Sequence, residues 1–129
     1  MRDIDRNINS QLYNKEPEIK EIFNQKIKMN VGEKSVSATL TNVKFKNKLY
    51  YAKVSCPKQF TDMTKITIYS GFTVLSVIFL SPQIGTSVNL TTGIIISDKE
   101  YAPINVLIEK TTAIADSIAE FTLQIYEEL

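Results

Sequence analysis

The sequence predicts a single α+β domain: an antiparallel sheet of about five to seven strands, N-terminal helical segments, and one long C-terminal helix packed on the sheet. This prediction rests on the spacing of apolar residues, which is helical at the start, has a period of two from residue 27, and is helical again after Pro103. A chain of 129 residues can bury one core of its own without disulfides. A small β-barrel covered by the helix is the alternative architecture.

Two helical segments are expected before residue 27. Ile4, Ile8 and Leu12 recur every four residues and form a narrow apolar stripe. Pro17 suits the first turn of a second helix, where its missing N–H group costs nothing. The apolar face of that second helix would be formed by Ile19, Ile22 and Phe23.

A β-hairpin is expected over residues 27–40, where apolar and polar residues alternate. Its turn is placed at Gly32-Glu33, because glycine in the first central position favours a type II′ turn. Counting outward from this turn pairs Met29 with Val36 and puts the apolar residues on one face. A second hairpin is expected to turn at Asn47-Lys48.

The second hairpin would carry a basic face. Lysines and one aromatic residue share the side opposite its apolar residues or lie at its turn, namely Lys44, Lys46, Lys48, Tyr51 and Lys53. Clustered cations and aromatic rings are what single-stranded nucleic acid requires, so these residues form a candidate nucleic-acid or anion face. Arginine occurs only as Arg2 and Arg6, and the net charge is only +1. The sequence therefore favours lysines that keep an exposed strand from pairing with other chains.

No charged side chain occurs between Lys65 and Asp98. A membrane span is the first hypothesis for such a stretch, but its Ser, Thr and Gly residues are spaced as strand faces and turns would space them. Ser70-Gly71 is expected to turn the chain, and residues 72–80 are almost continuously apolar. Such a run indicates a strand buried on both faces, or a strand with one face in an interface. Further strands are expected at 84–90 and 94–96.

Residues 103–128 are expected to form one long helix. Ile104, Thr111, Ile118 and Ile125 repeat every seven residues, and other apolar residues widen the stripe. A stripe this wide suits a helix that covers a sheet or enters an interface between subunits. The candidate protein interface consists of Ile104, Leu107, Ile108, Ile114, Ile118, Phe121 and Ile125.

The residues that most enzymes need are scarce. The chain has no histidine, one cysteine, and no glycine-rich phosphate loop. Histidine-dependent nucleophiles and the usual zinc sites are therefore excluded, and no catalytic residue, cofactor or metal is expected. Cys56 is expected to be a buried strand residue, although Lys53 and Lys58 could activate its thiol.

The sequence therefore predicts a non-enzymatic interaction or assembly protein: an adaptor, a chaperone-like protein, an inhibitor or a structural subunit. It would act through apolar surface of the helix or sheet and form homo-oligomers. Weak, sequence-tolerant nucleic-acid binding and transport of an apolar small ligand are the alternatives. The first residues lack the apolar run of a secretory signal, so a cytoplasmic protein without a membrane span is expected.

Overall fold

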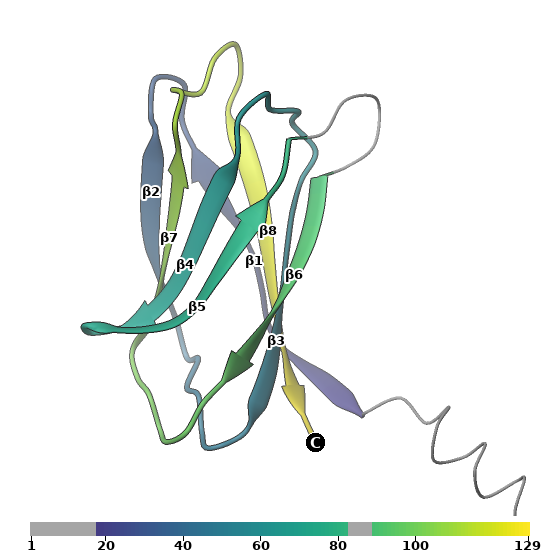
Figure 1. The fold of residues 1–129 in the computed structure, drawn as a ribbon, viewed down its shortest axis with the longest axis vertical. Helices are drawn as coiled ribbons and strands as arrows, with labels where there is room; N and C mark the ends of the chain where they lie inside the picture. Colours follow the sequence, from purple (N-terminus) through teal and green to yellow (C-terminus); the bar gives the residue numbers. More distant parts are fainter. Residues whose placement is uncertain (1–17, 83–88) are drawn as a thin grey trace, which may run out of the picture.

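The computed structural model describes residues 18–82 and 89–129. These residues form eight strands in two antiparallel sheets that face each other, and they contain no helix (Figure 1). The prediction of an α+β fold with a long C-terminal helix is therefore wrong, and the described residues form an all-β sandwich.

Each sheet has four strands. Sheet A has the order β1-β8-β3-β6 and sheet B has the order β2-β7-β4-β5. The strands are β1 (Ile19–Met29), β2 (Ser35–Leu40), β3 (Leu49–Cys56), β4 (Thr64–Ser70), β5 (Thr73–Leu80), β6 (Asn89–Ile96), β7 (Ile104–Lys110) and β8 (Ala119–Glu128).

Consecutive strands usually lie in opposite sheets. Among the eight strands, β4 and β5 are the only consecutive pair that hydrogen-bond to each other in one sheet. Every other connection crosses from one sheet to the other, and the resulting strand order is that of an eight-stranded jelly roll. Almost all strand pairing is therefore between residues far apart in the sequence.

The N-terminal part differs from its prediction. The predicted helix at Pro17 is instead strand β1, whose inward side chains include Phe23 and Ile27. Of the apolar face predicted for that helix, Phe23 is buried and Ile22 is partly buried, whereas Ile19 is 47% exposed, because a register shift lies between Glu21 and Phe23. The predicted helix at Ile4 and Leu12 lies outside the described residues.

The predicted hairpin at Gly32-Glu33 is a turn without a hairpin. Gly32 has a positive φ of 91°, and the Glu33 N–H donates to the Asn30 carbonyl oxygen at 3.0 Å. Met29, however, pairs with Ala119 in sheet A, whereas Val36 pairs with Ile108 in sheet B. The chain turns here between the two sheets, so the position of the turn was predicted correctly and the pairing was not.

The predicted C-terminal helix consists of strands β7 and β8, joined by a loop at 111–118. In β8, Phe121, Leu123 and Ile125 are buried and alternate with half-buried polar residues. The seven-residue repeat of apolar residues was therefore not a feature of one element. It ran across two separate strands and the loop between them. The abundance of Ile, Val and Thr also favours strands, because their branched side chains pack well on a pleated surface.

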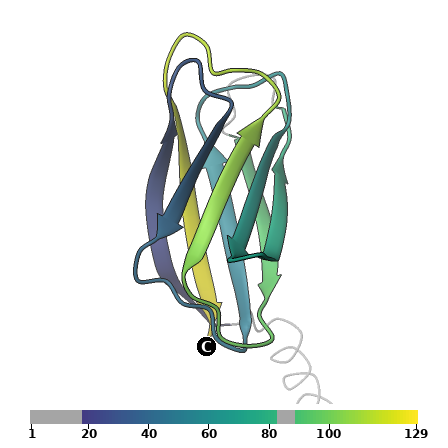
Figure 2. The ribbon, with the colours of Figure 1, turned by 90° about the vertical axis from the view of Figure 1, so that its left-hand side faces the viewer.

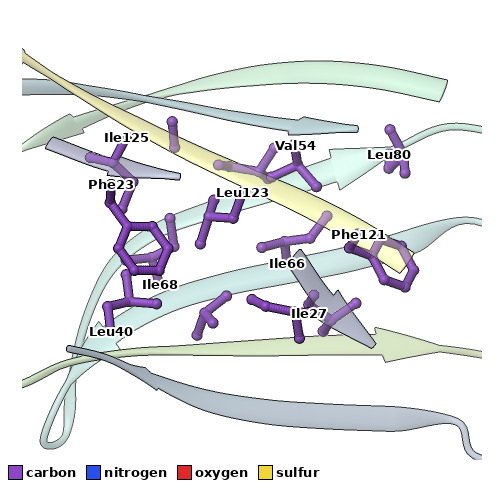
Figure 3. Close-up of a cluster of buried hydrophobic side chains, with 14 of the residues drawn as sticks. Phe23, Ile27, Leu40, Val54, Ile66, Ile68, Leu80, Phe121, Leu123 and Ile125 are labelled. Carbon is purple, nitrogen blue, oxygen red and sulfur yellow. The ribbon is translucent and has the colours of Figure 1, made fainter. Parts of the chain in front are cut away.

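The core lies between the sheets, as the close-up in Figure 3 shows. Both inner faces contribute, with Phe23, Leu123 and Ile125 from sheet A and Ile66, Ile68 and Leu80 from sheet B.

Gly93 allows β5 and β6 to approach each other at one side of the sandwich. A Cβ atom at this position would lie 2.6 Å from Cγ1 and 2.8 Å from Cδ1 of Ile78. The Ile78 side chain therefore occupies the space that a side chain at position 93 would need. The Ser76 hydroxyl donates to the Ile94 carbonyl oxygen at 3.4 Å and links the same two strands.

A buried ion pair fixes one end of the sandwich. The Lys110 ammonium lies 2.5 Å from an Asp62 carboxylate oxygen, and their side chains are 1% and 12% exposed. Asp62 also accepts hydrogen bonds from the Thr111 and Thr112 N–H groups and from the Thr111 hydroxyl. The Lys110 ammonium additionally lies 3.6 Å from the centroid of the Phe60 ring. Asp62 thus connects the β3–β4 segment to the loop after β7.

We predict that Gly93→Ala lowers the free energy of unfolding by about 1–3 kcal/mol, the usual cost of overpacking a core. Denaturation in urea measures this change. In an Ile78→Ala background the same substitution should be neutral or slightly stabilising, because the nearest remaining atom of residue 78, its Cβ, lies 3.7 Å away. An equal cost in both backgrounds would contradict the predicted contact.

We predict that Asp62→Asn lowers the free energy of unfolding by about 3–5 kcal/mol at neutral pH, because it leaves the buried Lys110 ammonium without its counter-charge. Adding Lys110→Met should recover much of this loss, since the apolar side chain needs no counter-charge. Urea denaturation of both variants provides the test. A double variant that is less stable than Asp62→Asn would contradict this account.

The same ion pair should make the protein sensitive to acid. Burial alone would raise the pKa of Asp62, but hydrogen bonds from Lys110, Thr111 and Thr112 outweigh burial and hold the pKa well below its usual range. The carboxylate therefore stabilises the folded state above about pH 4, and this stabilisation is lost as the pH falls toward the folded-state pKa. The double variant should lack this component of the acid dependence.

Candidate interaction surface

Exposed apolar side chains gather on one side of the sandwich. Eleven large apolar residues are exposed in the described part of the chain. Six of them belong to β5, β6 and the β4–β5 turn, and we call them the apolar surface: Phe72, Val74, Val77, Phe79, Ile94 and Ile96. All six fall within the charge-free stretch of the sequence. The stretch therefore contributes to the surface as well as to the core.

The outer face of β5 supplies half of the apolar surface. Val77 and Phe79 alternate with the buried Ile78 and Leu80, so they point away from the core. Beyond the register shift in this strand, Val74 pairs with Tyr69 of β4. On the same face of β7, Leu107 is half-buried and pairs with Thr67. Apolar side chains thus line the β5 edge of the outer face of sheet B, the sheet that faces the viewer in Figure 2, and Thr67 separates them from Leu107 on β7.

The apolar surface continues around the edge onto β6. The Ser76–Ile94 hydrogen bond and the Ile78–Gly93 contact place β6 directly beside β5. Ile94 and Ile96 lie on the outer face of sheet A, where they pair with Tyr51 and Leu49. The six side chains therefore wrap one side of the sandwich.

Phe72 stands at the tip of the β4–β5 hairpin. Gly71 has a positive φ of 58° and precedes it, which matches the first central position of a type II′ turn. The Phe72 side chain is fully exposed, and the hairpin tip projects from the sandwich at the lower left of Figure 1. Among the described large apolar residues, Phe72 is the most exposed.

A shallow depression lies at the other end of the same hairpin. Its volume is about 340 Å³, and it is lined by Met63, Lys65, Phe79, Glu109, Lys110 and Thr111. Met63 and Phe79 are each about half exposed and supply its apolar lining.

The outer faces of the two sheets differ in charge. Among its described residues, the outer face of sheet B carries Lys65 and Glu109, which pair across neighbouring strands and cancel. The outer face of sheet A carries at least five charged residues, namely Glu21, Lys26, Lys28, Lys53 and Glu120. Sheet A is therefore the face that suits contact with water.

Edge strands usually carry charges that prevent pairing with other chains. Lys20, Glu21, Lys26 and Lys28 serve this purpose on β1, and a register shift interrupts that strand. The other three edge strands, β2, β5 and β6, carry no charged residue, and of these three only β5 and β6 carry exposed large apolar side chains. This side of the sandwich is thus unprotected if it stays exposed.

The predicted protein interface is mostly interior. Ile104, Ile108, Ile114, Phe121 and Ile125 are at most 3% exposed and belong to the core. Of the remaining two residues, Leu107 lies on the outer face of sheet B and Ile118 is exposed in the β7–β8 loop. The helix that would have presented all seven together does not exist.

The predicted basic residues do not form one hairpin face. The Lys44 ammonium lies 3.2 Å from Glu100, and the Lys48 ammonium lies 2.9 Å from Glu127. Lys46 is exposed between them, whereas Tyr51 and Lys53 lie within β3 on the outer face of sheet A. Residues 43–46 form only a single bridge, between Phe45 and Tyr101.

Two observations concern metal binding and thiol chemistry in the described residues. These residues contain no group of three or more Cys, Asp or Glu side chains that could hold a metal ion. Cys56 is fully buried, and burial raises the pKa of its thiol. Nor do the two described ranges contain a helix of the length and apolarity needed to cross a membrane.

No known protein family matches the chain, and no curated protein matches it. Among solved structures, a chain from Bacillus endospore appendages, described as disulfide-linked pili, is 14% identical with a TM-score of 0.47, and the match covers 90% of this chain and 93% of that one. A chain of the infectious bursal disease virus Gx strain is 15% identical with a TM-score of 0.48, and one of the Gt strain is 15% identical with a TM-score of 0.43.

The viral matches cover 87% and 88% of this chain but only 32% and 34% of the viral chains, so this chain spans about a third of their length. All three TM-scores lie below 0.5. The strand order of the two sheets, rather than these similarities, defines the fold of this protein.

We predict that Cys56 does not react with a thiol reagent such as dithionitrobenzoate while the protein is folded, because the thiol is buried and stays protonated at neutral pH. One equivalent should react after denaturation in urea. Rapid reaction of the folded protein would contradict the buried position.

Proposed function

We propose that this protein is a non-enzymatic structural subunit that associates with copies of itself through the apolar surface. One observation carries the proposal: six exposed apolar side chains share the side of the sandwich whose edge strands carry no charge. Large apolar patches of this kind mark interaction sites. The proposal assigns no reaction to the chain.

Burial of this surface would be favourable, because each Val, Ile or Phe side chain removed from water contributes about 1.5–3 kcal/mol. Self-association also requires that like surfaces can face each other. Between Lys65 and Asp98 the chain carries no charge, so two such surfaces meet without repulsion.

The alternative of an apolar-ligand carrier placed the ligand between the sheet and the predicted helix. In the described residues the corresponding segment forms β7 and β8, whose inward side chains fill the core. The 340 Å³ depression on sheet B is open to the surface and small beside the apolar area around it. Self-association accounts for the exposed apolar side chains along the whole of β5, whereas a bound small molecule accounts for one corner of the apolar surface.

We predict that Val77→Glu combined with Phe79→Glu raises the dissociation constant for self-association at least tenfold, since about 1.4 kcal/mol of lost contact energy already gives that factor. Sedimentation velocity over a range of protein concentrations measures the change. Both residues are exposed, so the free energy of unfolding should change by about 0.5 kcal/mol or less per substitution.

The matched control is Val31→Glu combined with Ile118→Glu. These two residues are similarly exposed, at 54% and 49%, but lie outside the apolar surface. The control should associate like the unmodified protein. A monomeric unmodified protein at all concentrations, or an equal effect of both pairs, would contradict the proposed function.

A further inference from the structure

The β4–β5 hairpin carries a projection and a depression on one molecule. Phe72 projects at the hairpin tip, and the depression lined by Met63 and Phe79 lies where the hairpin begins and ends. Phe72 and Phe79 are seven positions apart in the sequence, a separation of roughly 23 Å along a strand. Projection and depression therefore lie at opposite ends of one hairpin.

We propose that two copies of the chain pack sheet B against sheet B as a closed two-fold pair, with Phe72 of each copy inserted into the depression of the other. The inference rests on the proposed function and specifies its partner and geometry. A two-fold axis that passes through the middle of the interface places the hairpin tip of each copy against the hairpin base of the other. The same symmetry operation therefore produces both Phe72 insertions.

The size and lining of the depression suit an aromatic ring. A cavity of about 150 Å³ is enough for benzene, and the depression measures about 340 Å³. Met63 and Phe79 offer a sulfur atom and an aromatic ring, both favourable partners for a phenyl group. Lys65 also lines the depression, and the aliphatic stem of its exposed side chain adds apolar contact.

The charge of sheet B also suits a self-complementary contact. A two-fold interface brings each surface against itself, so a surface with net charge would repel its copy. Lys65 and Glu109 pair and cancel on this face, whereas the outer face of sheet A has charges along β1 and β8. Between tip and base, Thr67, Val74 and Val77 provide an uncharged surface for the partner hairpin.

The first experiment tests the Phe72 side chain. Phe72→Ala should raise the dissociation constant at least tenfold in sedimentation velocity, as expected for a central aromatic anchor. Phe72→Tyr should change it less than threefold, because the ring is kept. At protein concentrations low enough to keep all three proteins monomeric, both variants should unfold at the same urea concentration as the unmodified protein, since residue 72 is fully exposed. Unchanged association of Phe72→Ala would overturn the inference.

The second experiment tests the geometry with a short bis-maleimide cross-linker, which leaves the buried Cys56 unmodified. Thr73→Cys places a thiol beside Phe72, and Met63→Cys places one in the depression, while Phe72 and Phe79 both remain. A mixture of these two single variants should cross-link, and neither variant alone should. The chain that carries both substitutions should yield covalent dimers and nothing larger.

The possible outcomes separate this inference from the proposed function. A ladder of covalent oligomers from the doubly substituted chain would show a head-to-tail contact and overturn the closed pair. Cross-linking of Thr73→Cys with itself, or no cross-linking in variants that still sediment as oligomers, would overturn the geometry and leave self-association standing. A monomeric unmodified protein would remove both proposals.

Discussion

The two sheets of this protein are held together by the apolar side chains between them. Backbone ladders join strands only within a sheet, and the described links between sheets are a few loop hydrogen bonds and the Ser76–Ile94 contact. Burial of both inner faces therefore determines which residues the chain can expose. It also explains the close approach at Gly93, where the edge of one sheet packs against a core side chain of the other.

The core is bounded differently at one end of the sandwich and along its β5–β6 side, and we describe these as two solutions. At one end, a buried ion pair replaces apolar contact, because Asp62 satisfies both the Lys110 ammonium and the free N–H groups of the following loop. Along the β5–β6 side the edge strands carry no charged residue. The first solution stabilises the monomer, whereas the second leaves apolar surface that self-association would cover. This contrast is the physical basis of the proposed assembly role.

Parts of the fold and of the surface were predictable from the sequence. The β4–β5 hairpin was predictable, because its turn residues Ser70-Gly71 and the apolar strand residues beside them are local signals. Residues 72–80 were recognised as either doubly buried or half in an interface, and the structure shows one buried face and one exposed face. The prediction of a helix over residues 103–128 was wrong. Ile104 and Ile108 are four positions apart, as are Phe121 and Ile125, and this spacing places two residues on the same face in helices and in strands alike.

The sequence by itself determined the absence of histidine chemistry, the turns at Gly32 and Gly71, and the charge-free stretch from which the apolar surface is built. The tertiary structure alone decided which strands pair, since Met29 meets Ala119 and Val36 meets Ile108 across 90 and 72 residues. It also decided which apolar residues are core and which are surface. The physical reason is that jelly-roll pairing is nonlocal: periodicity reports how side chains alternate along a strand, whereas burial depends on the sheet packed opposite.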